Sequence, residues 1–298
     1  MARTAYDPVP DALPLSRRSV SWMVLAEPIA FFGGGRAVLL QVAHPKVGAG
    51  VEQHSTYATD PWARLFRTVD VMAKLSFAPP AVSAQQATLL EAMHRRVTGA
   101  TDDGEPYAAL DPALLVWVWA TLVETGLIMY ERVFPPLTTA ERDQYYEEWK
   151  LVAYGCGVPR GACPPSWDDF ESYVARMVDE ELRVTRAARS VAHATMVPPL
   201  PWPLNRLSAG PQQLVTVGTF PAGLRDGFGF VWDSRRERRL RWFFAVTRFV
   251  TRLTPAYVRQ AGFRYVLRRE HPLRFPWLQR RGAARTARSM ASFDPTTR

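Results

Sequence analysis

The hydrophobic positions of this chain recur with the 3.6-residue period of helices, and no long alternating stretch typical of strands stands out. Helices are predicted over 37–54, 61–76, 84–98, 112–130, 139–155 and 166–194, the last one long or broken, and over 209–228, 235–253 and 255–269. The expected N-terminal caps are Asp60, Ser83, Asp111 and Ser166. The pattern therefore favours an all-α fold.

Prolines divide this helical pattern into parts. Four prolines fall among the nine residues MVPPLPWPL of 196–204, and no helix interior tolerates that density. We expect an extended N-terminal segment over 1–25, a single multi-helix core over 26–195 and a Pro-rich connector over 196–208. A smaller helical C-terminal part, 209–285, should pack on the core and be followed by a solvated tail, 286–298.

The composition of the 298 residues, 47% hydrophobic and 12% aromatic, excludes an intrinsically disordered chain. The net charge of +9 is concentrated in residues 235–298, which hold 17 of the 37 Lys and Arg residues but only 3 of the 28 Asp and Glu residues. Such an asymmetry suggests nucleic acid or an anionic membrane as a partner. Because no helix-turn-helix, zinc-finger or RNP-like pattern accompanies the charge, nucleic acid is disfavoured.

The predicted helix 235–253 leaves two interpretations open. Arg241, Arg248 and Arg252 lie close to one face, and aromatic and aliphatic residues cover the others. A basic amphipathic helix of this kind can lie on an anionic membrane, which would give a peripheral membrane contact through 235–269. The other interpretation, a core helix whose arginines face water, is the one we favour from the sequence.

The cysteine content and the apolar segments of the chain predict where in the cell the protein is located. Cys156 and Cys163 are too few for a disulfide framework, so we expect free thiols in a reducing compartment. The first twenty residues hold no continuous apolar region, and the longest apolar stretch, 113–123, falls short of the roughly 20 residues that cross a bilayer. We expect a cytoplasmic protein, with peripheral attachment at a membrane left open.

His94 is the first residue with distinctive chemistry. On the predicted helix 84–98 its neighbours at helical spacing are Leu90, Met93 and Val97, so the imidazole projects from an apolar stripe, and Arg95 and Arg96 follow it. An imidazole in an apolar wall beside cations suits a haem pocket, which needs a nitrogen ligand for iron and positive charge for propionates. A core histidine hydrogen-bonded to a backbone carbonyl is the alternative.

A second candidate group lies on the predicted helix 61–76. Arg64, Arg67 and Thr68 share one face at spacings of three and four residues. This face is either solvated or forms a hydrogen-bonding wall above a ligand, where a guanidinium can donate to dioxygen or to an anion.

The segment 31–55 contains three glycines followed by Arg36, but neither phosphate-loop motif is present. His44 and His54 are split by Pro45 and do not form a helical metal motif, and each either lines a pocket or caps a turn. HExxH, paired CxxC and GxSxG motifs are absent, which disfavours zinc hydrolases and α/β-hydrolases. His193 and His271 are expected at the surface.

Several segments between Ala26 and Asp233 resemble a known family. AVLLQVAHPKVGAGVEQHS, RLFRTVD, AMHRRVTG, YAALDP and GLRDGFGFVWD are similar to the mpaB-type and rubber-oxygenase (latex-clearing protein) catalytic domain, many of whose bacterial members were catalogued as a domain of unknown function. The resemblance implies an all-α fold that holds haem b. It also implies oxygen-dependent oxidation of isoprenoid-like chains.

The resemblance assigns expected roles to single residues. His94 matches the proximal haem ligand, and Arg64, Arg67 and Thr68 match a distal Arg-x-x-Lys-Thr segment, with Arg67 where the rubber oxygenases carry lysine. Arginine keeps its proton and cannot act as a compact amine ligand to iron. Trp119 stands where relatives often carry histidine, and an indole can only donate one hydrogen bond.

The resulting expectation is a haem b-dependent oxygenase that acts with dioxygen on a small apolar, isoprenoid-like molecule. Its catalytic residues would be Arg64, Arg67 and Thr68, its iron ligand His94, and its further cofactor-binding residues Arg95, Arg64, His44 and Arg36. Two alternatives belong to other classes: a haem carrier or sensor without turnover, and a basic peripheral membrane interaction protein. A homodimer is left open.

Overall fold

The structure is a computed structural model, and it describes residues 6–57, 61–196 and 204–271 together with the isolated positions 284, 288, 290 and 293. The predicted connector 196–208 therefore falls largely outside the described residues, as does the expected cap Asp60.

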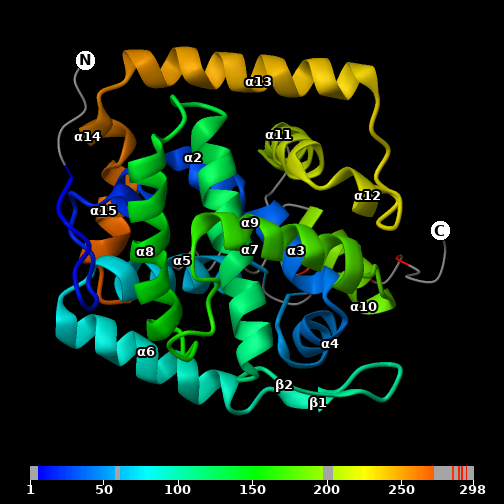
Figure 1. The fold of residues 1–298 in the computed structure, drawn as a ribbon. Coiled ribbons are helices and arrows are strands. Elements are labelled where there is room, and N and C mark those ends of the chain that lie inside the picture. Colours follow the sequence, from blue (N-terminus) through cyan, green and yellow to red (C-terminus); the bar gives the residue numbers. More distant parts are fainter. Residues whose placement is uncertain are drawn as a thin grey trace.

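The described chain is built from α-helices and one short hairpin, so the predicted all-α fold is confirmed (Figure 1). The first half contains α1 (Val20–Leu25), α2 (Pro28–Phe32), α3 (Gly34–Ala43), α4 (Pro45–His54), α5 (Pro61–Phe77), α6 (Pro80–His94), the antiparallel strands β1 (Thr98–Ala100) and β2 (Pro106–Ala108), and α7 (Pro112–Glu131). The second half contains α8 (Thr139–Gly155), α9 (Trp167–Arg176), a π-helical turn (Met177–Glu181), α10 (Arg186–Met196), α11 (Leu204–Thr219), α12 (Ala222–Arg225), α13 (Ser234–Leu253), α14 (Ala256–Arg259) and α15 (Ala261–Arg268).

Helix α7 forms the centre of the core. It is apolar on all sides and packs against α1, α2, α3 and α8, as expected for a helix that is buried all round. Among the described helices it alone is long and apolar enough to span a membrane, yet 72% of that stretch is buried inside the protein. Figure 1 shows α7 running through the middle of the molecule, which identifies it as the main core helix.

The helix ends follow local capping chemistry. Asp111 accepts a hydrogen bond from the backbone N–H of Ala113 at the start of α7, as predicted. Thr138 with Glu141, and Ser166 with Asp169, form capping boxes at the starts of α8 and α9. These short-range signals explain why the predicted bounds of α7 and α8 are confirmed almost to the residue.

The predicted boundaries of the helix that carries His94 are wrong at both ends. It begins at Pro80, because a proline is preorganised for the first helical position, and Ser83 lies inside it. The Ser83 hydroxyl is not a cap but donates to the carbonyl oxygen of Leu75 at 2.6 Å, across the turn from α5. At the other end the helix stops at His94, and Gly99, just beyond the predicted end, pairs with Tyr107 in the hairpin.

Other segments also depart from the predicted pattern. The predicted helix 37–54 is two helices, which meet at His44 and Pro45. Of the two possibilities predicted for 166–194, the broken helix is the correct one, and the break follows the π-helical turn, where the N–H of Arg183 donates to the carbonyl of Ala43. α1 begins at Val20, inside the segment expected to be extended, because Ser19 caps it and the carboxylate of Glu148 accepts from the N–H groups of Val20 and Ser21.

The C-terminal helices are part of the same packed body. α11 packs on α3 so closely that a Cβ at Gly35 would overlap the side chain of Thr216, and α15 packs on α5. Arg259 forms a buried ion pair with Glu27 at 2.7 Å, which joins α14 to the start of α2. Within the predicted tail, the described residue Phe293 stacks on His193 with ring centroids 4.2 Å apart, so this position contacts the core.

Both cysteines are free, as predicted. Burial raises the pKa of Cys156 to about 12 and that of Cys163 to about 11. Since the thiolate is the reactive form, these thiols are chemically inert.

Candidate functional site

The site predicted from the sequence lies at one end of the α5–α6 hairpin. The two helices pack side by side and are joined by Ala78 and Pro79 alone, so they run antiparallel. An α-helix rises 1.5 Å per residue, so Arg64 on α5 and His94 on α6 each lie about 21 Å along their helix from this connection. The fold therefore brings Arg64 and His94 to the same end of the hairpin, although thirty positions separate them in the sequence.

His94 is half-buried in the last turn of α6. Its Nδ1 atom is buried and has no hydrogen-bond partner among the described residues. Burial lowers the pKa of His94 below its ordinary value, since desolvation disfavours the imidazolium. At neutral pH this shift favours the neutral imidazole, and a buried Nδ1 without a partner is unusual for a buried polar group.

Arg64 supplies positive charge at the same level of the hairpin. Its side chain is half-buried, and no carboxylate among the described residues pairs with it. Desolvation lowers the pKa of Arg64, and the charge of Arg67 lowers it further, although a guanidinium stays protonated in a protein. Arg67 and Thr68 are exposed, and the Thr68 hydroxyl donates to the carbonyl oxygen of Arg64 at 2.9 Å.

His44 is a second histidine with an unengaged buried nitrogen. It caps the start of α4, and its Nδ1 atom is buried with no partner in the described part of the chain. Burial lowers the pKa of His44 despite the opposing charges of Glu181 and Asp111. Asp111 precedes α7, whose Leu114 packs with Val97 just after α6, so both histidines lie near the N-terminal end of α7.

Two residues predicted to bind a cofactor are engaged elsewhere. Arg36 is 2% exposed, pairs with Glu124 at 2.9 Å and donates to Thr125 and to the carbonyl of Thr219, so it joins α3 to α7 and α11. Arg95 projects into solvent and pairs with Glu91 one turn earlier on α6. Both guanidinium groups therefore have partners within the protein, and their role in binding a cofactor stays a prediction.

The remaining candidates also have local roles. The Nε2–H of His54 donates to the carbonyl oxygen of Thr98 in β1, 3.1 Å away, so this side chain joins the end of α4 to the hairpin. Trp119 is buried in the core and donates its one hydrogen bond to the carbonyl of Trp149 at 2.8 Å. His271 is exposed as predicted, whereas His193 is half-buried beneath Phe293.

The residues at the end of the hairpin fit a haem group better than a bare metal ion. Among the described residues no three His, Cys, Asp or Glu side chains are grouped as a metal site would require. Haem brings four of its own nitrogen ligands, so a single protein donor is sufficient. The unengaged imidazole of His94 can be that donor, and the arginines of α5 add positive charge at the same end of the hairpin.

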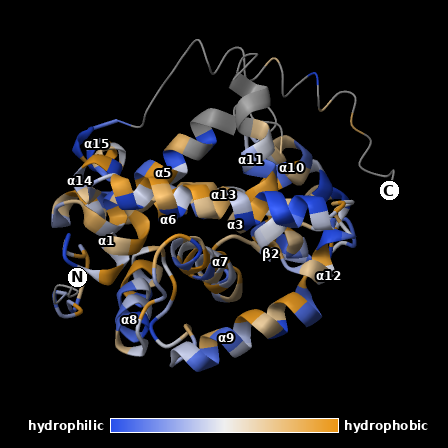
Figure 2. Cartoon of the chain, turned by 90° about the horizontal axis from the view of Figure 1, so that it is seen from above, coloured by the Kyte–Doolittle hydropathy of each residue, from blue (hydrophilic) through white to orange (hydrophobic). Residues whose placement is uncertain are grey.

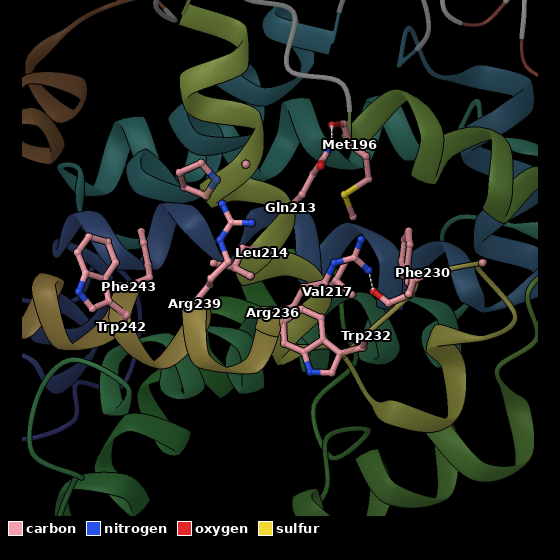
Figure 3. A pocket seen from close by; sticks show the side chains of 14 residues that line it. Met196, Gln213, Leu214, Val217, Phe230, Trp232, Arg236, Arg239, Trp242 and Phe243 are labelled. Carbon is pink, nitrogen blue, oxygen red and sulfur yellow. Dashed lines mark hydrogen bonds between the residues drawn. The ribbon is translucent and has the colours of Figure 1, made fainter. Parts of the chain in front are cut away.

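The sequence interpretation missed a pocket between α11 and α13, which Figure 3 shows from close by. It has a volume of about 750 Å³ and a mostly apolar lining, with Arg236 and Arg239 on one side. Figure 1 places α13 along the opposite side of the molecule from α6, so this pocket is separate from the His94 site. The aromatic residues of the segment FGFVWD, 228–233, were the signal that could have indicated it.

The fold and this site define an all-α protein in which His94, a histidine with an unengaged Nδ1 among the described residues, lies at the hairpin end that also carries the arginines of α5. The chain belongs to the family described as the catalytic domain of ER-bound oxygenase mpaB/B' and rubber oxygenase, whose model matches residues 22–249. It is an oxygenase-family protein, as the resemblance in its motifs indicated.

Two mycobacterial proteins are similar to most of the chain. They are the uncharacterized protein Mb2261 of Mycobacterium bovis and the uncharacterized protein Rv2237 of Mycobacterium tuberculosis. Each is 30% identical over 226 residues, which cover 73% of this chain and 87% of the relative. No solved structure matches the chain significantly.

Proposed function

We propose that the protein is a haem b-dependent oxygenase that oxidises a small apolar, isoprenoid-like molecule with dioxygen. The observation that carries this proposal is the buried Nδ1 of His94, which has no partner in the described part of this oxygenase-family chain. A buried polar atom without a partner costs free energy, so its persistence calls for a ligand that uses it.

Each side chain at the end of the hairpin has a separate role in the proposed reaction. His94 offers a neutral nitrogen lone pair, which burial protects from protonation. Haem, when bound there, supplies the redox-active iron for chemistry with dioxygen. Arg64 and Arg67 supply fixed positive charge that stabilises negative charge as it develops on oxygen, and Met93, half exposed on α6, offers apolar surface to a substrate.

Arg67 makes this site differ from the rubber oxygenases, which carry lysine at the matching position. A lysine can lose its proton and then coordinate iron, whereas a guanidinium cannot. We therefore propose that the side of the site formed by α5 offers hydrogen-bond donors and charge, with no protein ligand to iron.

The first test is the absorption spectrum of the purified protein, before and after reconstitution with hemin and reduction by dithionite. The wild-type protein should show a Soret band, and His94→Ala should lose most of it because the proposed protein ligand is absent. The matched control is His271→Ala, which changes an exposed histidine and should keep the full band. A folded His94→Ala variant with an unchanged Soret band would refute the assignment of the ligand.

The second test distinguishes an oxygenase from a haem carrier. Oxygen consumption is measured with the haem-loaded protein and unsaturated isoprenoids of increasing length, with saturated analogues as controls. Consumption that requires the double bonds supports oxygenase activity. Stable haem binding with no consumption for any of these substrates would favour a carrier or sensor instead.

A further inference from the structure

Helix α13 exposes a continuous apolar stripe on its outer side. Trp242, Phe249 and Leu253 are 69%, 64% and 69% exposed, and Val246 and Val250 beside them are also exposed. These positions recur at helical spacing and so lie on one face, whereas the two buried residues of α13, Leu240 and Phe244, lie on the opposite face. Single exposed apolar residues are normal, but a contiguous stripe marks an interaction surface.

The exposure of this stripe overturns the interpretation favoured from the sequence. The core-helix interpretation required the apolar residues of α13 to be covered and its arginines alone to face water. Instead the structure covers only the side that contacts α11 and α2, and leaves the stripe open. Tyr257 and Val258 of α14, which are also exposed, extend the apolar surface beyond the end of α13.

Arginines surround the stripe. α13 contains seven arginines and one acidic residue, Glu237, whose carboxylate accepts from the indole N–H of Trp232. The guanidinium groups of five of these arginines form no ion pair or hydrogen bond within the described residues: Arg235, Arg238, Arg239, Arg241 and Arg252. Figure 2, which views the molecule from above, shows a hydrophilic N-terminal half of α13 and a more hydrophobic C-terminal half.

We propose that this α13 surface, formed by the apolar stripe and the five unpaired arginines, docks the protein onto an anionic lipid membrane. Lipid phosphates provide the counter-charges that the arginines lack, and the boundary between headgroups and acyl chains accommodates Trp242, Phe249 and Leu253. This placement does not depend on haem, because the surface and the His94 site lie on opposite sides of the molecule (Figure 1).

A second copy of the chain fits this surface less well. Two α13 helices related by a two-fold axis would place arginines against arginines or against an apolar stripe, and neither arrangement supplies carboxylates. Glu237 is engaged with Trp232 and is the only acid on the helix. An anionic bilayer satisfies both halves of α13 at once, which is why it is the partner that the charges favour.

The pocket between α11 and α13 adjoins the same surface. Trp242 belongs to the stripe and also lines the pocket, and Arg239 lies next to it along α13 (Figure 3). The docked protein would therefore present two guanidinium groups, those of Arg236 and Arg239, directly beside the apolar contact.

The proposal is tested by sedimentation of the full-length protein with vesicles of phosphatidylcholine, with or without phosphatidylglycerol. We expect the protein to pellet with the anionic vesicles only, and less at high salt, since surface charges are screened. Arg238→Gln combined with Arg241→Gln should weaken partitioning about 25-fold, because each arginine near an anionic surface contributes about fivefold.

A second variant tests the apolar residues of the α13 surface, and it has a matched control. Phe249→Ser combined with Leu253→Ser should weaken partitioning at least about tenfold by removing the inserted side chains. The matched control is Leu89→Ser, which removes an exposed apolar residue of α6 on the other side of the molecule and should bind as the wild type does.

Three outcomes would overturn the proposal. The first is absence of binding to the anionic vesicles. The second is unchanged binding of the Phe249→Ser, Leu253→Ser variant, which would show a contact through charge alone. The third is a dimer in size-exclusion chromatography that this same variant abolishes, which would assign the surface to a second copy of the chain.

Discussion

Among the histidines of the described chain, His44 combines a half-buried position at the start of a helix, an unpartnered nitrogen and acidic neighbours. These properties lead to a prediction on how the stability of the protein depends on pH. Burial lowers its pKa in the folded state below the ordinary value of about 6.5. The unfolded state therefore binds more protons near that pH, and the free energy of unfolding should fall as the pH falls through about 6.5. Thermal unfolding of the haem-free protein at a series of pH values should show this decrease.

Replacement of this histidine should remove part of the decrease. His44→Gln keeps a polar side chain but no titrating group, so its melting temperature should fall less between about pH 7.5 and 5.5 than that of the wild type. His271→Gln, in which an exposed histidine is changed, should keep the wild-type pH dependence. An equal decrease in all three proteins would contradict the role given to His44.

Arg36 and Arg64 show that residue type alone does not predict whether an arginine is paired with a carboxylate. Arg36 and Arg64 look equivalent in the sequence, since each stands on a helix near a proposed site. The structure pairs Arg36 with Glu124, 88 positions away, and leaves Arg64 without a carboxylate among the described residues. Only the packing of α3 against α7 distinguishes the two side chains, because ion pairs depend on distance in space.

At the scale of elements, the contact between α11 and α13 depends on a glycine. A Cβ at Gly218 of α11 would overlap Trp232 and Leu240, whereas nothing lies within 4 Å of the corresponding position at Gly223 of α12. Gly218→Ala should therefore lower the free energy of unfolding by about 1–3 kcal/mol through overpacking. Gly223→Ala, the same chemical change in open space, should be neutral or slightly stabilising. Urea denaturation measures both, and equal stabilities would show that the two helices separate easily.

Helix boundaries were predictable where the signal is local and failed where it is not. The Asp111 cap of α7 and the capping box of α8 explain why the starts of these helices agree with the prediction. In α6 the expected cap Ser83 bonds to the carbonyl of Leu75, a partner in another helix, so the cap pattern was misleading. A hydroxyl can serve either purpose, and the neighbouring helix determined which one was realised.

At the scale of the whole molecule, we expect the C-terminal helices to unfold together with the core. α11 packs on α3, α15 packs on α5, and the buried pair between Arg259 and Glu27 joins α14 to α2. Arg259→Met leaves Glu27 without its partner and should lower the free energy of unfolding by about 3 kcal/mol.

The measurement is thermal unfolding followed by circular dichroism and by tryptophan fluorescence. Both probes should report one coincident transition, shifted to lower temperature in Arg259→Met. The control Arg268→Met, at an exposed arginine of α15, should melt as the wild type does. Two separate transitions in the wild type would mean that residues 204–268 form an independent unit.

The sequence by itself determined the class of fold, most helices, the free thiols, the family and the candidate histidine, because periodicity, caps and motifs are local properties of the chain. The tertiary structure decided which polar groups are paired, which Nδ1 atoms are unengaged and which side of α13 is covered. A helical period identifies two faces, but only the neighbouring helices select the one that is buried. The basic, apolar outer face of α13 and the His94 Nδ1, which has no partner among the described residues, both follow from that selection.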